Sequence, residues 1–144
     1  MFHSGKHIRL LSTLLVLGWC LGLAAPARAN IRFYTIVQQI CNSYRVPVDM
    51  RQMNLEEPGD SGLAFTLALQ SRRNNFEEVI LVGFIASGQA IARTGMEVKT
   101  ISIIVTIPKA DNMLLMTTAD VGLVEQLRLG KIKSSEFMRQ LQWN

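Results

Sequence analysis

The sequence contains very little histidine and cysteine. Its two histidines, His3 and His7, and one of its two cysteines, Cys20, lie in the first 29 residues. Beyond them the chain has no histidine, and Cys41 is the only cysteine. A segment of this kind has no intramolecular disulfide, no histidine-based catalytic triad and none of the usual zinc sites. The sequence therefore predicts neither a cofactor nor a metal centre.

Residues 1–29 have the pattern of a secretory signal peptide. Lys6 and Arg9 precede an apolar stretch over 10–23, and an Ala-Arg-Ala cleavage motif ends at Ala29. The apolar stretch is shorter than the roughly 20 residues that a membrane-spanning helix needs. We therefore expect an exported protein, periplasmic or extracellular after cleavage following Ala29, which meets the membrane only transiently through its leader. Retention of the leader as an anchor is the alternative.

Most of the net positive charge of the chain lies in this leader. The whole chain has a formal charge of +4, and residues 1–29 hold three of its 15 basic residues and none of its 11 acidic ones, so their removal leaves +1. A nucleic-acid-binding protein needs a clustered basic face. The close basic pairs that remain, such as Arg72 with Arg73, are typical of solvated edges. The sequence thus indicates no nucleic-acid partner.

The stretch from Asn74 to Gly95 is predicted to form one central helix. Asn75 is a favourable N-cap, and Glu78 follows at the spacing of a capping box. Gly95 suits the left-handed position that ends a helix. Nearly every residue between is apolar, which is typical of a helix buried on more than one side. Small residues form a strip along it that would let it lie close to a sheet: Gly83, Ser87 and Gly88.

Alternating apolar residues predict the strands. The alternation is clear over residues 63–70 and 98–107, and a returning strand is expected at 113–117. Residues 48–55 alternate poorly and predict a weak strand with a bulge or a frayed edge.

The remaining segments have helical spacing. A helix is predicted over residues 31–44, another that begins at Thr117 or Thr118, and a short last one that begins at Ser134 or the serine after it. The order of elements favours a single domain over residues 30–144. We expect a two-layer α+β fold, with an antiparallel sheet of about four strands and helices packed on one face.

The candidate binding surface is the polar side of the strand at 98–107. Thr100, Ser102 and Thr106 alternate with apolar residues, so we expect them on the sheet face away from the helices. A protein partner can pack on such a face or add a strand to a sheet edge. A simply solvated face is the alternative interpretation.

Two further candidates are weaker. Glu56, Glu57 and Asp60 offer oxygen ligands, but their spacing does not follow the ligand order of an EF-hand loop, and a solvated turn explains them. Cys41 lacks the histidine base that activates a nucleophilic thiol. It is expected to be a buried structural thiol, or, if exposed, to form an intermolecular disulfide.

These features favour an exported, non-enzymatic domain that acts through protein–protein association, with another protein or with a second copy. One alternative is a hydrolase that depends on carboxylates or hydroxyls, which predicts a pocket lined by convergent carboxylates. Another is a carrier of a small apolar ligand, which predicts an apolar cavity between helices and sheet.

Overall fold

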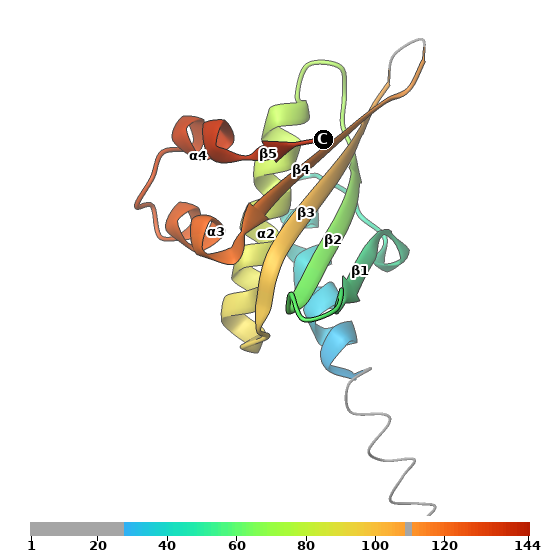
Figure 1. The fold of residues 1–144 in the computed structure, drawn as a ribbon. Helices are drawn as coiled ribbons and strands as arrows, with labels where there is room; N and C mark the ends of the chain where they lie inside the picture. The colour runs from blue at the N-terminus through green and yellow to red at the C-terminus, as the bar shows by residue number, and fades with distance from the viewer. Residues whose placement is uncertain (1–27, 109–110) are drawn as a thin grey trace, which may run out of the picture. The chain divides into compact units, whose positions relative to one another are not determined.

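The computed structural model of the chain describes residues 28–108 and 111–144 (Figure 1). The chain divides into two compact units, and the second, Arg32–Asn144, is the one considered below. The predicted leader, residues 1–29, lies outside the described residues except for its last two, which are helical. Over the described ranges, no helix combines the length and the apolar content needed to cross a bilayer.

A five-stranded sheet in the order β1-β2-β3-β4-β5 forms one layer of this unit. Its strands are β1 (Met53–Glu56), β2 (Leu63–Gln70), β3 (Val98–Ile107), β4 (Met113–Asp120) and β5 (Gln142–Trp143). β2 and β3 are parallel, and the other neighbouring strands are antiparallel. The predicted α+β class is therefore confirmed, with five strands instead of about four and one parallel pair in a mostly antiparallel sheet.

The helices pack against one face of this sheet (Figure 1). Residues 28–43 are helical, and the later helices are α2 (Phe76–Thr94), α3 (Val121–Arg128) and α4 (Ser134–Gln140). α2 connects β2 to β3, because two parallel strands need a crossover and cannot be joined by a tight hairpin. The sequence pattern had defined β2, β3 and α2 to within a residue or two, but not the parallel pairing.

The core lies between the sheet and the helices. Alternate residues of β2 and β3 point into it and are buried: Phe65, Leu67, Leu69, Ile101, Ile103 and Val105. Phe33, from the first helix, packs edge to face on Phe65 with ring centroids 4.8 Å apart. Phe84 of α2 meets Phe137 of α4 in the same way at 5.1 Å. α2 is thus enclosed from more than one side, as its composition predicted.

α2 approaches its neighbours closely because glycines stand at the contacts. A Cβ atom at Gly83 would lie 3.0 Å from the Cδ1 atoms of Ile103 and Leu69 in the sheet. A Cβ atom at Gly88 would lie 2.9 Å from Cγ1 of Val124 in α3. The predicted strip of small residues therefore serves two contacts, one with the sheet and one with a helix.

The predicted capping box of α2 is wrong, although its C-terminal end is confirmed. The side chain of Asn75 makes no cap hydrogen bond. Its Oδ1 atom instead accepts a hydrogen bond of 2.7 Å from the backbone N–H of Arg72. Gly95 has a φ of 70°, the left-handed conformation expected there. The Asn75 side chain thus stabilises the connection before the helix, and leaves the first-turn amides without a side-chain cap.

The predicted start of the third helix at Thr117 or Thr118 is also wrong. β4 continues through both residues to Asp120, and α3 begins at Val121. These two residues are strand and not helix because β4 pairs with β3 over this whole length. Thr117 is fully buried there, and the Thr118 hydroxyl is hydrogen-bonded to that of Ser102. A threonine followed by an acid is a helix-start signal, but β-branched residues fit a strand equally well.

The poor alternation of residues 48–55, where a weak strand was predicted, does not come from a bulge. A single 3-10 turn, Met50–Gln52, precedes β1. Asp49 begins it with a capping box, in which its carboxylate accepts from the Arg51 N–H and its own N–H donates to Gln52. The alternation of the strand therefore starts only at Met53.

Candidate functional site

The predicted binding residues alternate along β3 with the buried residues, so they lie on the sheet face away from the core. No described helix covers this face, which is called the open face below (Figure 1). Strand register arranges its side chains in four rows across the strands. The first row consists of Glu56, Ala64, Thr100 and Asp120, and the second of Asn54, Thr66, Ser102, Thr118 and Gln142. The third row consists of Ala68, Ile104 and Met116, and the fourth of Gln70, Thr106 and Leu114.

Charge is confined to one end of the open face. Glu56 and Asp120 both lie in the first row, and the other three rows contain no ionisable side chain. The second row consists of hydroxyls and amides, and the third is entirely apolar. At the opposite end, β2 leads directly into Arg72 and Arg73. The open face is therefore acidic at one end, uncharged across its middle and adjoined by basic residues at the other end.

Two hydroxyl groups of the second row are hydrogen-bonded to each other. The side-chain oxygens of Ser102 and Thr118 are 2.8 Å apart across β3 and β4, in a partly buried hydrogen bond. In the strand register, Thr66 of β2 lies next to Ser102 on the side opposite to Thr118. This pairing lowers the cost of covering the row with another surface, because a buried polar group is expensive mainly when it lacks a partner.

The three predicted residues, Thr100, Ser102 and Thr106, are on the open face in three different rows, each partly exposed. Residues four apart on one strand are separated by about 13 Å. They are therefore parts of an extended surface and do not converge on one point. Sequence reasoning missed the contribution of β4, where Leu114 is 64% exposed and Met116 partly exposed.

The carboxylates of the acidic loop are not gathered into a group of metal ligands. Glu56, Glu57 and Asp60 are all exposed. Among residues 28–108 and 111–144, no group of three or more acidic, histidine or cysteine side chains is arranged to hold a metal ion. These carboxylates therefore lie in water around a turn.

Cys41 is the only cysteine in the described residues, and it is a buried thiol. Its side chain is fully enclosed in the core, and this burial raises its pKa from 9.0 to about 11. The thiol therefore stays protonated near neutral pH, where the thiolate is the reactive form. The sequence left open whether Cys41 is buried or exposed, and the structure shows that it is buried.

Three pockets in the described residues each have a single carboxylate in their walls: Glu78, Asp49 and Asp120. Hydrogen bonds from Arg51 lower the pKa of Asp49 to about 2, so this carboxylate is ionised and paired in solvent. None of these pockets contains the two convergent carboxylates that a carboxylate-dependent hydrolase needs. The close approach at Gly83 also leaves no room for an apolar ligand between α2 and the sheet at that point.

Comparison of the chain with protein-family models, with curated proteins and with solved structures gave no match.

Proposed function

We propose that this protein is an exported, non-enzymatic domain that acts by association, and that two copies stack through their open faces. The observation that carries the proposal is the composition of that face, where three of four rows are uncharged. Apolar side chains such as Ile104, Met116 and Leu114 are left at least partly exposed there. An exposed apolar surface with a polar margin is typical of an interaction site.

Charge favours a second copy over an arbitrary partner. In a two-fold symmetric dimer the same surface serves both subunits, so a face with one sign of charge in its centre would repel itself. The centre of the open face has none. An antiparallel stack also places the acidic row of Glu56 and Asp120 opposite the end that leads into Arg72 and Arg73 of the other copy. The two ends of the face are thus complementary to each other.

The area of the face predicts a weak dimer. The five strands contain 4, 8, 10, 8 and 2 residues. At about 3.3 Å per residue and 4.8 Å between strands they cover roughly 500 Å². Two such faces together bury about 1,000 Å², which is at the lower limit for a specific interface. We therefore expect a reversible dimer whose population rises with concentration.

Export forms the second part of the proposal. It is supported by the signal-peptide pattern of residues 1–29, and cleavage after Ala29 would give a mature chain beginning at Asn30. Intact-mass measurement of the exported protein tests this point, and a chain that retains residues 10–23 would contradict it.

Sedimentation of the purified protein over a wide range of concentrations tests the dimer. We expect the mass to rise from one copy to two. Thr66→Lys should abolish this rise, because a hydrated ammonium group would have to lose water in the middle of the interface. Gln39→Lys adds the same charge to an exposed site on the first helix and should leave dimerisation unchanged. A single-copy mass at every concentration, or equal effects of the two lysines, would contradict the proposal.

A further inference from the structure

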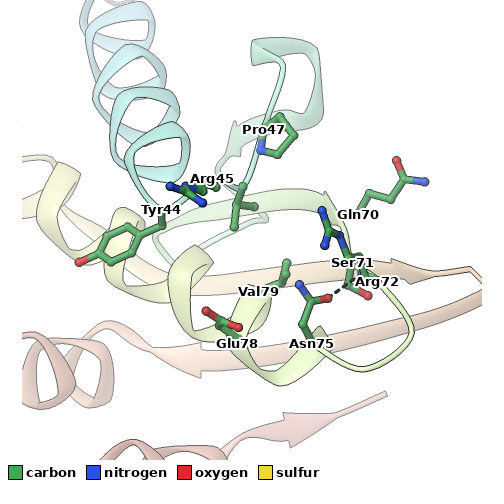
Figure 2. Close-up of a pocket in the computed structure, with 10 residues that line it drawn as sticks. Tyr44, Arg45, Pro47, Gln70, Ser71, Arg72, Asn75, Glu78 and Val79 are labelled. Carbon is green, nitrogen blue, oxygen red and sulfur yellow. Dashed lines mark hydrogen bonds between the residues drawn. The ribbon is translucent and has the colours of Figure 1, made fainter.

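The largest of the three pockets lies at the carboxyl end of β2, next to the basic end of the open face, and Gln70 belongs to both. It has a volume of about 490 Å³, within the range of roughly 300–1,000 Å³ that small-molecule sites occupy. Its walls come from the turn after the first helix, from the residues that follow β2 and from the first turn of α2 (Figure 2). The carboxyl ends of strands, next to the start of a crossover helix, are a common position for ligand sites in open sheets.

Two arginines give the pocket a positive charge. Arg45 lies on the turn after the first helix and Arg72 on the connection from β2 to α2 (Figure 2). The ion pairs within the described ranges join Arg51 to Asp49 and Arg128 to Glu125, so both pocket arginines are without a carboxylate partner there. Glu78 is the only acid in the pocket wall. The pocket therefore has an excess of one positive charge.

The N-terminus of α2 adds to this positive potential. No side chain caps it, because the Asn75 side chain accepts no hydrogen bond from the first-turn amides, and its Oδ1 accepts instead from the backbone N–H of Arg72 (Figure 2). Asn75, Glu78 and Val79 of this first turn all line the pocket. The free amides and the macrodipole at a helix start attract anions.

A buried hydroxyl in the wall independently points to a ligand. Ser71 lines the pocket, is only 5% exposed, and its hydroxyl oxygen has no hydrogen-bond partner in the described residues. A buried hydroxyl without a partner is costly, and such groups are few in folded proteins. An acceptor oxygen of a bound molecule would give Ser71 its partner.

Arg45 occupies a backbone position that suits glycine. Its φ is 61°, and it ends the first helix in a Schellman motif, with the Val46 N–H donating to the Cys41 carbonyl at 2.9 Å. The left-handed conformation is unfavourable for a residue with a side chain, and glycine is usual there. The geometry of the turn alone would therefore favour glycine at this position.

We infer that this pocket binds a small organic anion through a phosphate or carboxylate group held by Arg45, Arg72, the Ser71 hydroxyl and the start of α2. The guanidinium groups match both oxyanions in geometry. Apolar walls from Val46, Pro47 and Val79 leave space for a non-polar part of the ligand. Anion binding in this pocket does not require two copies to stack, although Gln70 and Arg72 also lie at the basic end of the open face.

Binding of three probes of one shape to the purified protein tests the inference: phenyl phosphate, benzoate and the neutral benzamide. Calorimetry or ligand-detected NMR should show binding of at least one of the two anions at millimolar concentration, and weaker binding or none of benzamide. Preference between the two anions identifies the group that the site takes. Absence of binding by both anions, or equal binding of benzamide, would overturn the inference.

Four variants locate the site. Arg72→Gln should weaken binding of the anion about tenfold or more, as expected for loss of a charge-assisted hydrogen bond. Its matched control, Arg73→Gln, removes a neighbouring charge that does not line the pocket and should leave binding unchanged. Arg45→Gly should also weaken binding while the melting temperature stays the same or rises, since glycine suits that φ. Glu78→Gln should strengthen binding. Equal affinity in Arg72→Gln and Arg73→Gln would assign the bound anion to the general surface and overturn the site.

Discussion

Phe84 and Phe137 join α2 to α4 through an edge-to-face contact, with ring centroids 5.1 Å apart and both side chains fully buried. Removing one ring leaves a cavity that the surrounding core cannot fill completely. Phe84→Ala should therefore lower the free energy of unfolding by about 3–5 kcal/mol. Thr100→Ala, on the open face, should change it much less. Denaturant unfolding of the two variants measures the difference, and equal small losses would show that the core has been misassigned.

The two glycines Gly83 and Gly122 should respond in opposite ways to alanine. A methyl group at Gly83 would press on Ile103 and Leu69, which are buried and have little space to move. Overpacking costs about 1–3 kcal/mol, which equals or exceeds the gain in helix propensity of about 1 kcal/mol. Gly122 is exposed on α3 with no atom near its Cβ position, so only the gain applies. Thermal unfolding should show Gly83→Ala less stable and Gly122→Ala more stable than the parent. A stabilised Gly83→Ala variant would mean that α2 and the sheet are less tightly packed.

Burial of Cys41 should make stability depend on pH in the alkaline range. Its pKa is raised from 9.0 to about 11 because burial favours the neutral thiol. The folded chain therefore retains a proton that the unfolded chain releases between these values, and the contribution to stability is complete below pH 9 and lost as the pH rises towards 11. Urea unfolding across this window should give a steeper loss for the parent than for Cys41→Ala. Parallel curves would indicate that Cys41 is accessible to solvent.

The sequence pattern was sufficient to predict a helix or strand wherever its local structure and its burial agree. β2 and β3 alternate strictly because one face of each packs on the core and the other does not. α2 is apolar nearly all round because it contacts the sheet at Gly83 and α3 at Gly88. These elements make up the centre of the fold. The alternation of β3 also predicted that Thr100, Ser102 and Thr106 lie on one side of the strand.

Features that depend on distant parts of the chain could not be predicted in this way. The parallel pairing of β2 with β3 is a choice of partner, which alternation does not specify. β5 has two residues, too few for any periodic pattern, and forms because α4 returns the chain to β4. The anion pocket combines Arg45 with Arg72, far apart in the sequence. In the structure, the left-handed φ of Arg45 and the unpartnered hydroxyl of Ser71 mark it, and no sequence signal indicates either feature.

The most direct test of stacking through the open face is a concentration series of methyl NMR spectra. Ile104 and Met116 lie in its apolar row, whereas Ile132 lies outside the sheet, between α3 and α4. If two copies stack, the methyl signals of Ile104 and Met116 should shift progressively and saturate as the mass doubles, while that of Ile132 stays constant. Unchanged signals from Ile104 and Met116 over a range in which the protein dimerises would contradict the account, because the copies would then meet through another surface.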